Sequence, residues 1–326
     1  MSTLVPAVSG LLGGLALFLF GMNAMTGALQ DAAGERMRSV LAAAVRTPLT
    51  GALTGAAVTA VLQSSSAATV AVLGFVSAGL MDLPQAISVI FGANVGTTVT
   101  AQLLAYSLDG LIYPILFAGF LARSAVRGRR GRSLASAAFF FAVLLEGVRI
   151  MSRAAEPLTG SARFAGLMAL AAGRPILGLL LGCSMTVLAQ SSSATVAVLQ
   201  RLAAAPGADG ASSALGLAGA LPILLGCNIG TTVTGLIAAA GGSKDAKRAA
   251  LAHLIFNLSG SAALLPALPA FARLAAWLSP AGPETAVIAR QIANAHTLFN
   301  LLCTAGWLPL TGIMAKLVTR AIPDEK

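Results

Sequence analysis

Long apolar stretches without any charged side chain dominate this sequence. Seven of them have 24 residues or more, and they cover residues 2–30, 47–81, 83–108, 175–200, 210–243, 249–272 and 291–315. A helix that crosses the hydrocarbon core of a bilayer needs about 20 residues. The pattern therefore predicts an all-α, polytopic membrane protein whose partner is the lipid bilayer.

Polar residues interrupt two of these stretches in the same way. "QSSSA" occurs at 63–67 and again at 190–194, each time 15 residues after a proline, Pro48 or Pro175. Further along, "GANVGTTVT" at 92–100 is matched by "GCNIGTTVT" at 226–234. Such self-similarity indicates an internal repeat. We expect one transport domain over 1–326, with repeat 1 at 11–106, repeat 2 at 137–240 and C-terminal transmembrane helices at 249–320.

The length of the interrupted segments predicts re-entrant hairpins. A helix from Pro48 to Leu62 is about 22 Å long at 1.5 Å per residue, which is less than the roughly 30 Å of the hydrocarbon core. We expect hairpins at 48–80 and 175–201 with QSSS at their tips. Proline suits the first turn of such a helix.

Charge sets the expected orientation. Only 10% of the residues are charged and 57% are hydrophobic, against roughly 25% charged in soluble proteins. Five arginines crowd the central loop: Arg123, Arg127, Arg129, Arg130 and Arg132. By the positive-inside rule this loop is cytoplasmic.

Counting crossings outward from that loop places the N-terminus outside and the C-terminus in the cytoplasm. Inside segments then carry 14 Lys and Arg residues and outside segments carry 6. Arg153, Arg163 and Arg174 form an outside cluster, which an interfacial amphipathic helix at 153–173 would explain. We expect an inner-membrane protein. The net charge of +10 does not indicate a nucleic-acid partner, because the basic residues lie in short loops without interleaved aromatics.

The crossing count makes the two repeats inverted in topology, because it puts both ends of 48–80 inside and both ends of 175–201 outside. Secondary transporters with this arrangement place their site near the bilayer midplane. At each tip, the first turn of the second arm offers unpaired N–H groups and a partial positive charge, which suit an anion. Hydroxyl donors for a tetrahedral anion are expected from Ser64, Ser65, Ser66, Ser191, Ser192 and Ser193.

The "GxNxGTTxT" segments predict a broken transmembrane helix in each repeat, because paired glycines permit an unwound stretch. Their Asn and Thr side chains offer the oxygen ligands that hard cations take. Neither motif pair contains Lys or Arg, and an isolated buried anion costs far too much free energy. Co-bound cations are the natural remedy, so the residues favour cation-coupled anion transport. The alternative is that these small residues only allow close helix packing.

These motifs resemble the type II sodium/phosphate cotransporter family. "QSSSA" at 63–67 and 190–194, both "GTTVT" segments and "AHLIFN" at 252–257 carry the resemblance. It implies symport of inorganic phosphate with Na⁺ by alternating access, and no cofactor beyond Na⁺ as the coupling ion. It implies phosphate contacts from all the QSSS positions, which adds Gln63 and Gln190 to the six serines. It also implies sodium ligands among Gln63, Ser65, Asn94, Thr97, Thr98, Gln190, Ser192, Asn228, Thr231 and Thr232. Many bacterial members carry a PhoU-like domain after the membrane part, and we expect a short form without it.

Other functions remain in view. A sodium-independent or exporting permease for phosphate or another oxyanion fits the same scaffold, and the sequence leaves the oligomeric state open. An enzyme is not expected, because there is no Gly-x-Ser-x-Gly elbow and no Ser-x-x-Lys pair.

Glu146 and Arg149, three residues apart, are expected to form an ion pair. His253 with Asn257, and His296 with Asn300, are each expected to form interhelical hydrogen bonds; a role in pH sensing or proton coupling is the alternative.

Overall fold

The computed structural model describes residues 4–34, 45–106, 108–159, 166, 173–207 and 212–324. Within those ranges the chain forms helices and no β-strand. The α-helices are α1 (Leu4–Ala33), α3 (Pro48–Leu62), α4 (Ser65–Ser77), α5 (Leu83–Leu104), α6 (Ile112–Ala125), α7 (Arg129–Thr159), α9 (Pro175–Ala189), α10 (Ser192–Ala204), α11 (Gly216–Ala239), α12 (Lys244–Leu264), α13 (Leu268–Trp277), α14 (Glu284–Trp307) and α15 (Thr311–Ala321).

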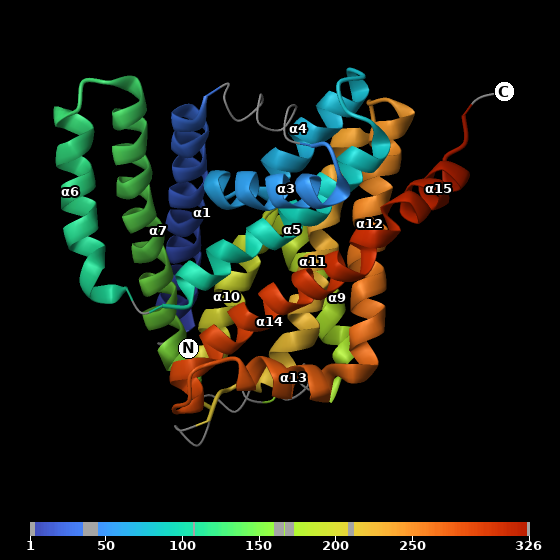
Figure 1. The fold of residues 1–326 in the computed structure, drawn as a ribbon. Helices are drawn as coiled ribbons and strands as arrows, with labels where there is room; N and C mark the ends of the chain where they lie inside the picture. Colours follow the sequence, from blue (N-terminus) through green and yellow to red (C-terminus); the bar gives the residue numbers. More distant parts are fainter. Residues whose placement is uncertain are drawn as a thin grey trace.

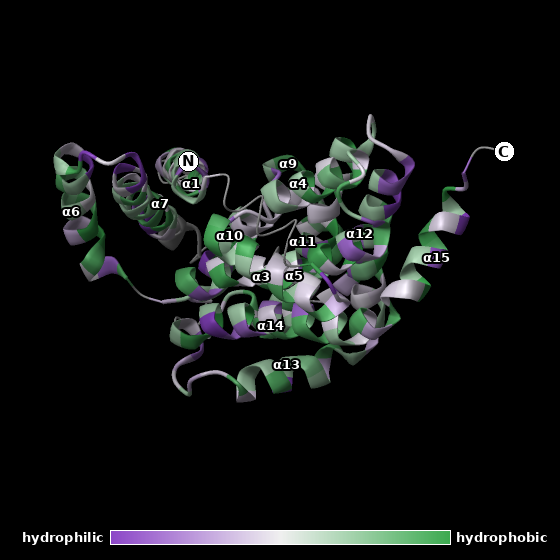
Figure 2. Ribbon diagram, turned by 45° about the horizontal axis from the view of Figure 1, so that its top comes forward, coloured by the Kyte–Doolittle hydropathy of each residue, from purple (hydrophilic) through white to green (hydrophobic). Residues whose placement is uncertain are grey.

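Length and hydropathy confirm the prediction of an all-α polytopic membrane protein. In the described part of the chain, six segments are long and apolar enough to cross a membrane: Val5–Ala33, Leu83–Leu104, Arg129–Ala154, Gly216–Ala239, Lys244–Trp277 and Glu284–Ala321. Large apolar side chains such as Phe117 and Trp277 face outward, and the outermost helices in Figure 2 are largely apolar. Apolar surface on this scale is typical of a protein surrounded by lipid.

Helices α1, α6 and α7 stand side by side at one edge of the molecule (Figure 1). The turn between α6 and α7 lies at the upper end of this view, together with the C-terminus, while the N-terminus lies at the lower end. Close contact between α1 and α7 depends on small residues. A Cβ atom added to Gly147 would come within 2.5 Å of the Phe18 backbone nitrogen, so only glycine permits this separation.

Each predicted hairpin consists of two short helices joined at its QSSS tip, α3 with α4 and α9 with α10. Polar contacts show that the two hairpins begin at opposite ends of α5, each at the end of the hairpin far from its QSSS tip. Near the start of α5, Gln85 donates to the carbonyl of Val45, just before α3, at 2.9 Å. At the other end, Arg201 of α10 donates to the carbonyl of Leu104 at 2.8 Å. A helix of 22 residues is about 33 Å long, so the hairpins enter the protein from opposite sides.

The prediction of a broken helix in each repeat is wrong. Residues 92–100 lie inside the continuous helix α5, and residues 226–234 lie inside the continuous helix α11. The glycines serve close packing instead. A Cβ added to Gly92 would lie 1.8 Å from the carbonyl oxygen of Ala52 on α3, and one added to Gly226 would lie 2.0 Å from that of Leu179 on α9. Because α3 packs directly against Gly92 and α9 against Gly226, these glycines allow close contact between helices, and α5 and α11 stay helical there.

The C-terminal helices pack across both repeats. α12 and α14 contact α5 and α11, and Thr304 of α14 donates to the carbonyl of Phe91 at 3.3 Å. At the start of α12, Arg248 forms ion pairs with Asp245 and Asp324, which fixes the end of the chain beside α12. The interfacial helix expected at 153–173 lies partly outside the described residues: 153–159 continue α7, and 160–165 and 167–172 are not described.

Candidate functional site

The two hairpin tips have nearly the same backbone conformation. Gln63 and Gln190 both adopt the left-handed region, with φ of 54° in each case, and they are the two non-glycine residues with positive φ among those described. The serine that follows each glutamine is extended, at φ −150° for Ser64 and −151° for Ser191. Left-handed conformations at residues other than glycine cost free energy and cluster at functional sites. The repeated strain therefore marks both tips.

The first serine of each tip caps the following helix. The hydroxyl oxygen of Ser64 accepts from the N–H of Ala67, and that of Ser191 accepts from the N–H of Ala194, both at 3.2 Å. Ser191 also donates to the sulfur of Met22 at 3.5 Å. The first N–H groups of a helix have no partner within it, so the N–H groups that follow each cap point out of the helix end. Ser64 and Ser191 thus have a structural role as well as a predicted binding role.

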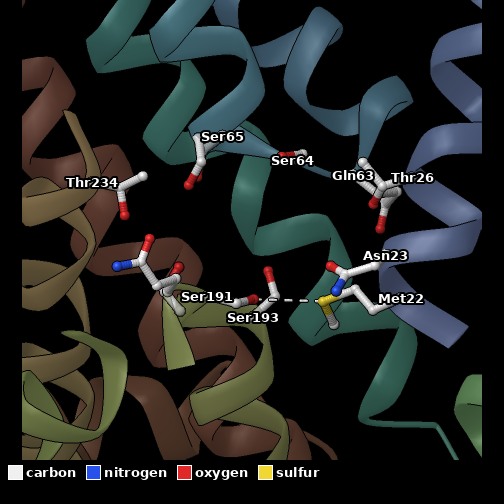
Figure 3. A pocket seen from close by; sticks show the side chains of 12 residues that line it. Met22, Asn23, Thr26, Gln63, Ser64, Ser65, Ser191, Ser193 and Thr234 are labelled. Atoms are coloured by element: carbon white, nitrogen blue, oxygen red, sulfur yellow. Dashed lines mark hydrogen bonds between the residues drawn. The ribbon is translucent and has the colours of Figure 1, made fainter. Parts of the chain in front are cut away.

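One cavity of about 280 Å³ collects all eight QSSS residues predicted to bind the anion. At ~30 Å³ per water molecule, that is the space of roughly nine waters. Figure 3 shows Ser65 reaching into the cavity from one hairpin, Ser191 and Ser193 from the other, and Thr234 from a further side. Its lining consists of Met22, Asn23, Thr26, Gln63, Ser64, Ser65, Ser66, Gln190, Ser191, Ser192, Ser193 and Thr234.

Among the residues that the structure describes, no charged side chain belongs to this lining. Its polar groups are hydroxyls and amides, together with the two helix N-termini at Ser65 and Ser192. Both of these serines are buried. Neutral donors and helix dipoles can hold an anion, but they do not cancel its full charge.

Four lining residues were not predicted from the sequence: Met22, Asn23, Thr26 and Thr234. Three of them come from α1, whose "LFGMNAM" segment stands out only as a weak match to 145–151. Thr234 closes the second "GTTVT" segment, and its counterpart Thr100 donates to Gln63 Oε1 at 2.9 Å. The last threonine of each segment was therefore the available signal, since it recurs in both repeats.

The remaining predicted sodium ligands lie away from the cavity lining. The four threonine hydroxyls donate to carbonyl groups of their own helices at distances of 2.7–3.1 Å. This leaves their oxygen lone pairs as acceptors. The residues in question are Thr97, Thr98, Thr231 and Thr232, and with Asn94 and Asn228 they occupy the packed interior of α5 and α11.

Asn94 and Asn228 hold the C-terminal helices. The Nδ2 group of Asn94 donates to the carbonyl of Ile90, which turns Oδ1 toward His253 Nε2 at 3.0 Å. His253 is therefore the donor in that pair. Asn257 also donates to Asn94 Oδ1, at 3.4 Å.

The second repeat reproduces this arrangement, with His296 Nε2 3.0 Å from Asn228 Oδ1. The predicted interhelical hydrogen bonds of both histidines are thus confirmed. For Asn257 the interhelical bond is confirmed as well, whereas Asn300 donates to the carbonyl of His296 within α14.

The predicted ion pair between Glu146 and Arg149 is also confirmed. The two side chains are 2.7 Å apart on α7. Arg149 donates a further hydrogen bond to the hydroxyl of Tyr113 on α6, and its guanidinium lies 4.8 Å from the centre of that ring. The pair thus fastens α6 to α7 outside the cavity.

The fold and the site define a class of protein: a polytopic helical membrane protein in which two oppositely inserted helix hairpins enclose a neutral polar cavity. The chain belongs to the Na⁺/Pi-cotransporter family. The family model matches it twice, at residues 17–153 and 143–272, as expected of a duplicated sequence.

Relatives extend this similarity. The chain is 32% identical over 307 residues to the uncharacterized protein YqeW of Bacillus subtilis, covering 94% of this chain and 95% of that protein. It is 28% identical over 256 residues to the putative inorganic phosphate export protein YjbB of Escherichia coli, covering 78% of this chain and about half (46%) of that protein.

The sodium-dependent phosphate transport protein 2A of rat is 35% identical over 102 residues, which are 31% of this chain and 16% of that protein. No solved structure matches the chain.

Proposed function

We propose that this protein carries inorganic phosphate across the membrane together with Na⁺, by alternating access to the cavity between the two QSSS tips. The observation that carries the proposal is that the cavity joins two helix N-termini and six serine residues, with no charged group among the described residues of its lining. Helix N-termini are ready anion sites. Membership of the Na⁺/Pi-cotransporter family supports phosphate as the anion.

The neutral lining is the argument for cation coupling. A phosphate mono- or dianion leaving water for this site gains neutral hydrogen-bond donors but no counter-charge. The free-energy cost of burying an unpaired charge is larger than the stabilisation that such neutral donors provide. A bound Na⁺ supplies the missing charge, and hydroxyl and amide oxygens are suitable ligands for a hard cation.

Within the site, the serine hydroxyls and the helix N–H groups at 65–66 and 192–193 bind phosphate, while Ser64 and Ser191 fix the tips through their caps. Sodium binds at the edge of the same cavity, with Gln63, Ser65, Gln190 and Ser192 as oxygen donors. Asn94, Thr97, Thr98, Asn228, Thr231 and Thr232 stay as proposed ligands for a state in which α5 or α11 has shifted to face the cavity. Inverted repeats supply such a second state, because exchange of their conformations opens the opposite side.

The expected orientation belongs to this proposal. The arginine-rich turn between α6 and α7 and the C-terminus lie at one end of the molecule, and the N-terminus lies at the other (Figure 1). By the positive-inside rule the first of these ends faces the cytoplasm. The protein would then sit in the inner membrane with its N-terminus outside.

The second candidate is a permease that exports phosphate or works without Na⁺. The name of YjbB, putative inorganic phosphate export protein, favours it, since the two chains are 28% identical over 256 residues. Both candidates use the same cavity. They differ in coupling and in the direction of net flux.

Phosphate uptake into proteoliposomes separates the candidates. We expect an inward Na⁺ gradient to accelerate uptake of labelled phosphate at least tenfold over an equal K⁺ gradient. Equal rates in Na⁺ and K⁺ would exclude the symport and leave the permease.

The site is tested by Ser65→Ala and Ser192→Ala. Each should weaken apparent phosphate affinity about tenfold, in line with the roughly 1.5 kcal/mol of a hydrogen bond to a charged group. Ser152→Ala is the matched control, because its hydroxyl bonds to the carbonyl of Val148 within α7, outside the cavity. Unchanged kinetics in both cavity variants would mean that the tips only pack.

A further inference from the structure

A second polar cavity lies at the turn that joins α6 to α7, away from the transport site. It has a volume of about 420 Å³ and is lined by Phe120, Arg123, Ser124 and Arg132. Arg123 belongs to the last turn of α6 and Arg132 to the first turn of α7. Two guanidinium groups from adjacent helices therefore share one groove.

No acidic side chain of α6 or of the first half of α7 balances the positive charge of this groove. From Gly110 to Leu145 the sequence contains five arginines and no Asp or Glu. The ion pair nearest in the sequence, Glu146 with Arg149, lies more than three helical turns further along α7. Figure 2 shows hydrophilic colour at this turn and mostly hydrophobic colour along the middle of α6. Arginine presents planar donor pairs that match phosphate oxygens, so the groove suits a phosphate group.

An exposed apolar stripe leads into the groove along α6. Tyr113, Phe117 and Phe120 are 57%, 64% and 54% exposed, and spacings of three and four residues place them on one helix face. From Tyr113 to Phe120 the stripe is about 10 Å long at 1.5 Å per residue. Phe120 belongs to the stripe and to the groove lining alike, so the apolar and cationic surfaces are continuous.

Arg123 is oriented from the α7 side. Its guanidinium carbon lies 5.6 Å from the centre of the Phe140 ring, and Gly119 allows α6 to approach α7, since a Cβ there would come within 2.7 Å of the Phe139 nitrogen. The hydroxyl of Ser124 donates to the carbonyl of Phe120 at 3.1 Å. The groove is therefore built by the packing of the two helices.

From this geometry we propose a binding site for one anionic glycerophospholipid, with the phosphate in the Arg123–Arg132 groove and an acyl chain along the stripe Tyr113–Phe117–Phe120. Free inorganic phosphate shares the headgroup chemistry, but it makes no contact with the stripe. Both surfaces are used at once only by a molecule with a phosphate and a hydrocarbon chain. The site lies at the membrane–water boundary of whichever leaflet this turn faces.

The test measures binding of phosphatidylglycerol and phosphatidylcholine to the full-length purified protein by native mass spectrometry. We expect phosphatidylglycerol to bind at least tenfold more tightly than phosphatidylcholine. In the double variant R123Q/R132Q this preference should fall about tenfold. The double variant R127Q/R129Q removes the same charge from the same turn without touching the groove lining, and it should lose at most twofold.

A second variant fills the groove without changing any charge. Ser124→Phe should lower phosphatidylglycerol binding about tenfold as well, so the proposal stays testable if R123Q/R132Q does not fold. Equal losses in both double variants would show general charge attraction and overturn the site, as would no loss in either. Displacement of phosphatidylglycerol by millimolar inorganic phosphate would overturn the lipid assignment in favour of free phosphate.

Discussion

At the scale of single residues, the two tips share a backbone but differ in how their glutamines are held. Gln63 donates to the carbonyl of Ala60 at 2.5 Å and accepts from Thr100 at 2.9 Å. The Gln190 side chain is exposed, and no such pair of bonds holds it in the described structure. The left-handed backbone conformation costs each of these two residues roughly 1–2 kcal/mol of free energy, because they carry a Cβ atom. Repeat symmetry is therefore preserved in the main chain and relaxed in the side chains.

This difference predicts different responses to glycine. Gln63→Gly and Gln190→Gly both relieve the left-handed strain and both add entropy to the unfolded chain, by about 0.5–1 kcal/mol. Only Gln63→Gly also loses two hydrogen bonds, each contributing about 1 kcal/mol. We expect Gln63→Gly to be less stable than Gln190→Gly by about 2 kcal/mol in denaturant unfolding of the purified protein. Equal stabilities would show that the Thr100 bond contributes nothing.

The buried asparagines give a second prediction. Asn94→Ala leaves the donor of His253 without an acceptor and also removes the 3.4 Å bond from Asn257, which keeps its 3.1 Å bond to the carbonyl of His253, whereas Asn228→Ala removes only the bond from His296. Each unsatisfied group costs about 1–3 kcal/mol. The same unfolding measurement should therefore show a larger loss of stability for Asn94→Ala. A larger loss for Asn228→Ala would contradict the hydrogen-bond arrangement at α12.

At the scale of helices, the fold depends on two closely packed pairs, α3 with α5 and α9 with α11. Glycine recurs every fourth residue on both partners, at Gly51 and Gly55 against Gly92 and Gly96. Without a hydrophobic driving force between helices in lipid, association relies on such close backbone approach. The hairpins are thus held by their first arms, while the serine tips remain at the cavity.

Replacement of one of these glycines should separate a pair. In Gly92→Ala the new Cβ meets the carbonyl oxygen of Ala52 at 1.8 Å, so backbone must move, and we expect a loss of more than ~3 kcal/mol. Gly74→Ala is the control, because Gly74 lies in helix α4 with nothing within 4 Å of an added Cβ. It should be neutral or stabilising by up to about 1 kcal/mol. The readout is thermal unfolding in detergent; a tolerated Gly92→Ala would refute the close approach.

At the scale of the whole molecule, two hairpins that start from opposite ends of α5 meet at one cavity. The lining draws on α1, both hairpins and α11, and in the proposed mechanism a shift of one hairpin would open the cavity on the side of that hairpin. That is the geometric requirement for alternating access. The lipid groove at the α6–α7 turn lies outside this assembly, and lipid binding there can be altered separately from transport.

The orientation can be tested on intact cells. A fluorescent protein that folds only in the cytoplasm should be fluorescent when fused to the C-terminus, and an enzyme tag active only outside should be active when fused to the N-terminus. The expectation follows from the excess of Lys and Arg at the C-terminal end of the molecule. Two cytoplasmic termini would contradict the opposite ends seen in Figure 1.

The sequence by itself determined the membrane class, the duplication and the positions of both hairpin tips, because apolar length and motif spacing are local properties. It also predicted the ion pair of Arg149 with Glu146, since residues three apart share a helix face, and the interhelical bonds of His253 and His296. The prediction of broken helices was wrong because a glycine, which has no Cβ, permits both an unwound backbone and close helix packing. Only the position of the neighbouring helix shows which of the two occurs.

Tertiary structure alone decided what encloses the cavity. Met22, Asn23 and Thr26 join it because α1 happens to pass the tips, which no local pattern encodes. Tertiary structure also decided the partners of Asn94 and Asn228. Their side chains accept hydrogen bonds from the buried histidines of α12 and α14, because these two helices pack against α5 and α11. Short-range chemistry placed the donors along the chain, and long-range packing selected which of them face the cavity.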